Sequence, residues 1–163
     1  MKRVDIPGGG AYEVMVSGTS DGRQYAYIAG TSSVSRKYNL CILDVTHPLN
    51  STIIQTIDFE HYPLSITVCS DGKMPDGHHY AFFVTYHSFF LDDMSPEVII
   101  IVIYIIDITN PTSPVIIKTF ETQGWRSEWN EIWPSKVYLV EMADGHYYAY
   151  MAAGPRGLII ISE

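Results

Sequence analysis

Asp21-Gly22-Arg23-Gln24-Tyr25-Ala26-Tyr27 is the first of three copies of one short string, and this repetition decides the fold. The second copy reads Asp76-Gly77-His78-His79-Tyr80-Ala81-Phe82, and the third reads Asp144-Gly145-His146-Tyr147-Tyr148-Ala149-Tyr150. A motif that recurs in the same order along a chain is the signature of a repeat architecture. The sequence therefore predicts three tandem units of one structural design.

A second string follows each copy of the first. It reads Cys41-Ile42-Leu43-Asp44-Val45-Thr46-His47-Pro48 in unit one, Tyr104-Ile105-Ile106-Asp107-Ile108-Thr109-Asn110-Pro111 in unit two, and Leu158-Ile159-Ile160-Ile161-Ser162 in unit three. Its nearly continuous apolar character predicts a strand that is buried on both faces of a sheet. The Asp-Gly pair in the first string predicts a hairpin turn, because glycine accepts the positive φ that such a turn requires.

Each unit reads as short antiparallel strands rich in β-branched and aromatic residues. Three prolines (Pro48, Pro111 and Pro114) precede the fourth strands, which indicates that these strands lie at an outer edge, where a missing N–H does least harm. No window of ten or more residues shows a helical apolar period. The predicted strands cover 12–16, 25–29, 40–45 and 52–57 in unit one, and 65–69, 80–85, 101–108 and 115–120 in unit two.

Four-stranded antiparallel units with central strands covered on both sides are typical of β-propeller blades. We therefore expect an all-β fold with two complete units and a three-stranded third. The whole chain, residues 1–163, is predicted to be a single repeat domain. Its units span approximately 11–60, 61–122 and 123–163.

The same strings resemble the LVIVD repeat, in which an apolar strand ends in an aspartate and a Ser/Thr-x-Pro turn. The resemblance rests on Cys41 to Pro48, on Tyr104 through Asp107 to Val115, and on the shortened Leu158 to Ser162. It implies a bacterial or archaeal propeller, often in an extracytoplasmic setting, and says little about function. Unit two departs from the pattern by an insertion around Ser88 to Val98, and unit three lacks the aspartate-proline turn and the fourth strand.

Two complete units and three further strands fall short of the four to eight blades of a propeller. Residues 2–6 read as the end of a fourth strand that could complete the last blade. Two alternatives stay open. The chain is a fragment of a larger propeller, or two copies exchange strands and close a six-bladed homo-oligomeric ring with a two-fold axis.

The composition excludes several classes of function. With 18 acidic and 10 basic side chains the formal net charge is −8, so the chain lacks the basic surface that nucleic acids and anionic membranes attract. A hydrophobic content of 47% argues against intrinsic disorder. The longest apolar run, Val98 to Ile106, is too short for a membrane helix, and Val4 to Gly10 offers no signal-peptide core.

The polar residues suggest no catalytic, cofactor or metal site. Cys41 and Cys69 are predicted to be two buried thiols without a disulfide, because they fall in strands of different sheets. Asp44 and Asp107 read as Asx-type turns, in which the carboxylate accepts backbone N–H groups. Histidines such as His78 and the equivalent His146 read as solvated turn residues, since the spacing of zinc ligands is absent. No nucleophile elbow and no phosphate-binding loop is present.

The candidate ligand-binding residues are Trp125, Arg126, Trp129 and Trp133. The three tryptophans of the chain lie at four-residue intervals, which would place them on one side of one or two helical turns. They form either an exposed platform for a sugar, a peptide or a protein, or a buried cap of the propeller or of an oligomer interface.

The sequence thus predicts a non-enzymatic binding or assembly module with a protein or carbohydrate partner. Its ligand site is expected at the tryptophan segment and the Ser88 to Val98 insertion, which alone depart from the repeat. The alternative is a fragment of a larger propeller enzyme whose active site needs blades outside this chain.

Overall fold

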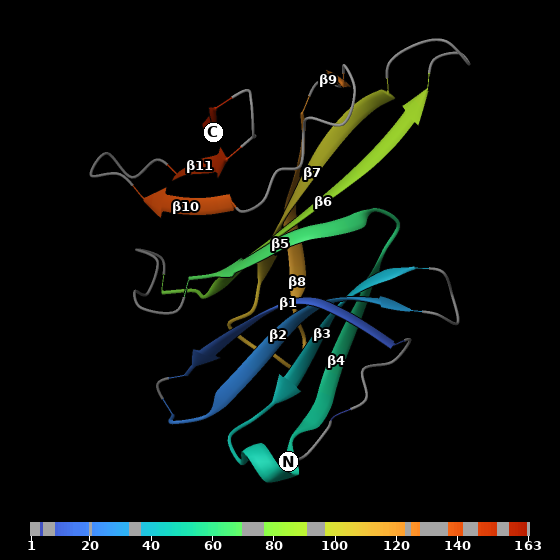
Figure 1. Cartoon of the computed structure of the whole chain (residues 1–163). Coiled ribbons are helices and arrows are strands. Elements are labelled where there is room, and N and C mark those ends of the chain that lie inside the picture. Colours follow the sequence, from blue (N-terminus) through green and yellow to red (C-terminus); the bar gives the residue numbers. More distant parts are fainter. Residues whose placement is uncertain are drawn as a thin grey trace.

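The first unit folds as an antiparallel meander in which each strand pairs with the next along the chain (Figure 1). The computed structural model describes residues 4, 9–19, 21–32, 37–69, 77–90, 97–122, 125–127, 137–141, 147–152 and 157–162. The strands of the first sheet are β1 (Gly9–Gly18), β2 (Gln24–Ser32), β3 (Tyr38–Asp44) and β4 (Thr52–Phe59). A single 3-10 turn, η1 (Pro48–Asn50), joins β3 to β4 where the prolines predicted a turn.

The second sheet repeats this meander of four strands, and the third sheet repeats its first three strands, so the predicted all-β fold of antiparallel units is confirmed. The strands of the second sheet are β5 (Tyr62–Val68), β6 (Tyr80–Phe90), β7 (Glu97–Asp107) and β8 (Val115–Glu121), and a short strand, β9 (Trp125–Ser127), pairs with β7. The strands of the third sheet are β10 (Val137–Glu141), β11 (Tyr147–Ala152) and β12 (Leu158–Ser162).

The strand register repeats from unit to unit. The first tyrosine of the Tyr-Ala string faces the last residue of the apolar strand in all three sheets, as the pairs Tyr25–Asp44, Tyr80–Asp107 and Tyr148–Ser162. The glycines of the first two Asp-Gly strings, Gly22 and Gly77, have φ values of 83° and 80°, as the hairpin prediction required. The sequence repeats therefore correspond to repeats of structure.

The main core lies between the facing sides of the first and second sheets. Alternate residues of β2 and β3 on the first sheet pack against alternate residues of β5, β6 and β7 on the second, since successive side chains of a strand point to opposite faces. A second cluster joins the second and third sheets, where Met151 of β11 packs with Val84, Ile101 and Ile103. The central strand β3 is buried from Asn39 to Leu43, which confirms the prediction that it is covered on both faces.

The first strands of the three sheets are neighbours. The strand β5 contacts both β1 and β10, and Figure 1 shows it between the two. The Glu13 carboxylate of β1 accepts a hydrogen bond of 2.8 Å from the backbone N–H of Ile66 in β5. The three sheets therefore meet along their first strands.

The outer face of the first sheet, which points away from the second sheet, carries a third cluster. Ala26, Cys41 and Leu43 are buried there, and Val4 packs against them. The predicted closing strand at residues 2–6 lies outside the described residues apart from this valine.

Candidate functional site

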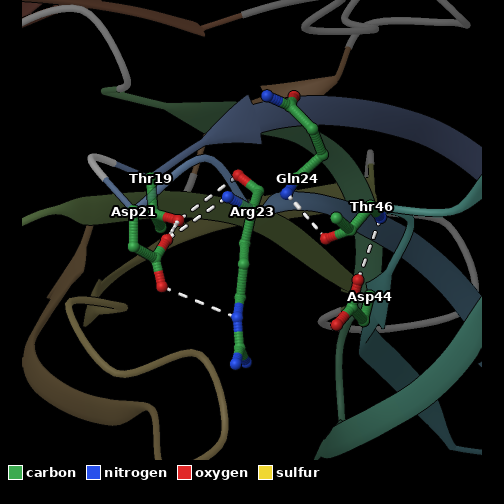
Figure 2. Close-up of polar contacts among 6 residues, drawn as sticks. All are labelled: Thr19, Asp21, Arg23, Gln24, Asp44 and Thr46. Atoms are coloured by element: carbon green, nitrogen blue, oxygen red, sulfur yellow. Dashed lines mark hydrogen bonds and ion pairs between the residues drawn. The ribbon is translucent and has the colours of Figure 1, made fainter.

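The aspartate that ends β3 holds a turn, which we call the Asp–Thr latch (Figure 2). Its carboxylate oxygen Oδ1 accepts a hydrogen bond of 2.9 Å from the backbone N–H of Thr46. The Thr46 hydroxyl in turn accepts one of 3.1 Å from the backbone N–H of Gln24, at the start of β2. Hydrogen bonds from Thr46 lower the pKa of Asp44 and so keep the carboxylate ionised.

The second unit contains the same latch with equivalent residues. Asp107 Oδ1 accepts from the backbone N–H of Thr109 at 2.9 Å, and the Thr109 hydroxyl accepts from the backbone N–H of His79 at 2.9 Å. His78 Nδ1 lies 2.7 Å from Asp107 Oδ2. Burial opposes ionisation of Asp107, but the hydrogen bonds from Thr109 and His78 outweigh it and lower the pKa of this carboxyl. The Asx-type turn predicted for both aspartates is confirmed.

The hairpin that leads into the first latch is held by its own polar residues. The Thr19 hydroxyl donates to the Asp21 carboxylate, which also accepts from the backbone N–H of Arg23 at 3.3 Å. The Arg23 side chain lies 3.6 Å from the same carboxylate, and both groups are exposed (Figure 2). These contacts organise a turn, since the Asp21 carboxylate is occupied by the backbone and neighbouring side chains of its own hairpin.

The most distinctive part of the fold is an extended hairpin end on the second sheet. Strands β6 and β7 pair over eleven positions, from Tyr80–Asp107 to Phe90–Glu97, whereas β2 and β3 pair over seven. The insertion predicted around Ser88 to Val98 therefore lengthens this hairpin. Strand β9 pairs with the same end of β7, with Val98 opposite Arg126 and Ile99 opposite Trp125. Figure 1 shows β9 beside that end of β7.

The structure thus joins the described ends of the two segments that depart from the repeat. We call the three-stranded end of residues 87–90, 97–100 and 125–127 the β6–β7–β9 tip. Two aromatic side chains, Phe89 and Phe90, are 43% and 65% exposed on it. On the neighbouring strand Val98 and Ile99 are buried. The tip therefore presents one exposed aromatic side chain on each of its two faces, since successive side chains of a strand point to opposite faces.

The predicted ligand-binding residues are only partly placed by the structure. Trp125 and Arg126 lie in strand β9, so the helical turn suggested by the tryptophan spacing is wrong at this point. Trp129 and Trp133 lie outside the described residues. Sequence reasoning selected the insertion but missed Phe89 and Phe90 as its exposed residues, although the doubled aromatic at the end of a strand pattern was a usable signal.

A second cluster, at the junction of the first and second sheets, was not predicted. The rings of His61 and His87 meet edge to face with centroids 4.3 Å apart, and His61 Nδ1 lies 3.4 Å from the Tyr104 hydroxyl. Burial and the neighbouring His87 lower the pKa of His61, against the opposing effect of Glu60 and Glu121. No sequence signal links residues so far apart in the chain.

Neither histidines nor cysteines build a metal site in the described part of the chain. Within those residues no group of three or more His, Cys, Asp or Glu side chains is placed to hold a metal ion. Cys41 is a buried thiol of β3 in the first sheet, and Cys69, which follows β5 in the second, is a half-buried thiol; neither forms a disulfide. The prediction of a buried thiol is confirmed for Cys41 and is wrong for Cys69. Burial raises the pKa of Cys41.

A scan against protein-family models and searches among curated proteins and solved structures found no match to this chain. Among the helices of the described residues, none has the length and apolar character needed to cross a membrane.

Proposed function

We propose that this chain is a non-enzymatic binding module of β-propeller type, built from LVIVD-like repeats, and that it binds its partner at the β6–β7–β9 tip. The propeller-type arrangement is supported by three meanders with one register, which meet along their first strands. The LVIVD-like character is supported by the Asp–Thr latch, which has the same hydrogen bonds in units one and two.

The main observation in support of this binding site is the pairing of β9 with β7. Repeat proteins place their variable segments on a constant scaffold, and binding residues concentrate in such segments. Here the described parts of both departures from the repeat pair in one three-stranded end, with Phe89 exposed on one of its faces and Phe90 on the other. Aromatic side chains are enriched in binding interfaces because they bury a large area at a small entropic cost. The tip is therefore suited to a peptide or to the apolar face of a sugar.

The test selects ligands for the wild-type chain from a glycan array and a peptide library, and then measures their affinity by calorimetry. The double variant Phe89→Ser/Phe90→Ser should bind the selected ligand at least about tenfold more weakly, as loss of aromatic anchors costs more than about 1.4 kcal/mol. The control Val115→Ser changes an equally exposed residue of β8 and should leave the affinity unchanged.

Unchanged far-UV circular dichroism and thermal midpoint of the double variant would confirm that the loss is local. A selected ligand that binds the double variant as tightly as the wild-type chain would show that the tip is not the site. Failure of the wild-type chain to select any glycan or peptide would contradict the binding function itself.

A further inference from the structure

Because the strand register is the same in all three units, each face of one sheet has an equivalent face on the other two sheets. The face of the first sheet that packs on the second sheet carries Leu40 and Ile42, both of which are fully buried. Their equivalents in the third sheet, by register, are Leu158 and Ile160 of β12. These two side chains are 60% and 54% exposed. The third sheet therefore exposes the face that the first sheet buries.

The tyrosines of the repeat show the same difference in burial between the first and third sheets. Tyr25 and Tyr27 of β2 are buried against the second sheet. Their equivalents Tyr148 and Tyr150 of β11 are only half-buried, and Tyr150 stands opposite Ile160 in the pairing with β12. The open face of the third sheet is therefore a copy of a face that already makes an interface within this chain.

The opposite kind of face lies on the outside of the first sheet, where it is buried at its centre and open along β1. The second sheet presents Ala81, Phe83 and Ile106 to the first sheet, and all three are buried in their interface. Their equivalents on the outer face of the first sheet are Ala26, Ile28 and Leu43, which form the apolar cluster that Val4 covers in part. Beside them on β1, Val14 and Val16 are more than half exposed, and Val16 pairs with Ala26.

We propose that the open face of the third sheet packs on the outer face of the first sheet of a second copy of this chain, and that two such contacts close a six-sheet ring. The interface would reproduce the contact that the first and second sheets already make, with the equivalent residues on each side. The proposal depends on the propeller-type arrangement of the repeats and is independent of ligand binding at the tip.

A second copy is favoured as the occupant because both halves of the interface occur on one chain. The exposed side chains at the open parts of the two faces are apolar or aromatic: Val14 and Val16 on the first sheet, and Tyr138, Leu158 and Ile160 on the third. A contact between two different faces is heterologous, so it closes into a ring when the rotation per sheet allows it and otherwise grows into a filament. The sheets diverge from neighbouring first strands, which is the geometry that closes around an axis.

The test measures the solution mass of the full chain by multi-angle light scattering. The wild-type protein should be a dimer, with twice the 18.4 kDa mass of a single chain. The variants Ile160→Lys and Val16→Lys each place a charge on one of the two faces and should both be monomers. The matched control Val115→Lys alters a residue of β8 with similar exposure, outside both faces, and should remain a dimer.

Mixing the two monomeric variants distinguishes this interface from other dimers. One of the two contacts in a mixed pair joins two unaltered faces, so the mixture should recover a dimer that dissociates more readily than the wild-type one. Circular dichroism of each variant separates loss of assembly from loss of folding.

Three results would overturn the proposal. The first is a wild-type chain that stays monomeric at its highest soluble concentration. The second is a dimer that Val16→Lys leaves intact, since this indicates a contact of two identical faces. The third is a mass that keeps rising with concentration beyond two chains, which indicates a filament. None of these results depends on whether the tip binds a ligand.

Discussion

Ile42 and Ile160 occupy the same position of the repeat in different surroundings, and this difference yields a quantitative prediction. The Ile42 side chain is fully buried between the first and second sheets, and that of Ile160 is 54% exposed on the third sheet. Truncation of a buried isoleucine to alanine removes its transfer free energy and leaves a cavity, with a usual cost of 2–5 kcal/mol, and we expect Ile42→Ala to cost about 3–4 kcal/mol. Because Ile160 is half exposed and would leave no enclosed cavity, Ile160→Ala should cost about 1 kcal/mol or less.

Urea unfolding followed by far-UV circular dichroism measures both free energies of unfolding. For a domain of this size the Ile42→Ala midpoint should fall by about 1–2 M urea. Measurements at low protein concentration keep the chain monomeric, so that assembly does not add to the apparent stability of Ile160. Equal losses for the two variants would refute the claim that the third sheet has an open face, and a loss under about 1 kcal/mol for Ile42→Ala would refute its place in the core.

Three further outcomes are expected from the second unit. Thr109→Val should lower the free energy of unfolding by about 1 kcal/mol, because the backbone N–H of His79 loses its acceptor, and a thermal midpoint equal to that of the wild type would contradict the latch. The pKa of Asp107 is lower when folded than when unfolded, so its stabilisation is present above the ordinary aspartate pKa of 3.8 and is lost as the pH falls through the folded value. Urea titrations at several pH values should therefore show that the wild type has a higher free energy of unfolding than Asp107→Asn, and that this difference shrinks below about pH 4. A difference independent of pH would contradict a role of the ionised Asp107 carboxylate in stability. Gly77→Ala should lower the free energy of unfolding, measured by chemical denaturation, by about 1 kcal/mol, because φ is 80° at this position. The cause is backbone strain and not a clash, since no neighbouring heavy atom lies within 4 Å of the added methyl group. An unchanged free energy of unfolding would disprove this cause.

Most of the fold could be predicted because the repeat carries local signals. The Asp-Gly turns, the apolar strands and the prolines before the fourth strands depend on backbone conformation and side-chain alternation within a few residues. All eight strands predicted for the first two units are present, and most extend further than the sequence pattern indicated. The extension of β6 and β7 appeared in the sequence only as an insertion, since pairing between its two arms is not a local property.

The candidate site was less predictable for the same reason. The Asp–Thr latch follows from neighbouring residues and was predicted as an Asx-type turn. Strand β9 was not predicted, because three residues carry no periodicity and their pairing partners lie 26 to 30 positions earlier in the chain. The contact of His61 with His87 likewise depends on how the two sheets pack.

The sequence by itself determined the repeat: three all-β units, their hairpin turns, their buried central strands and the residues that break the pattern. These are local matters of φ, side-chain alternation and apolar run length, which a short window contains. The tertiary structure decided which faces are buried and which stay open, and it brought the insertion and β9 together at one end of the second sheet. Equivalent residues such as Ile42 and Ile160 are indistinguishable in a repeat, and only the sheet packed against them sets their burial and their contribution to stability.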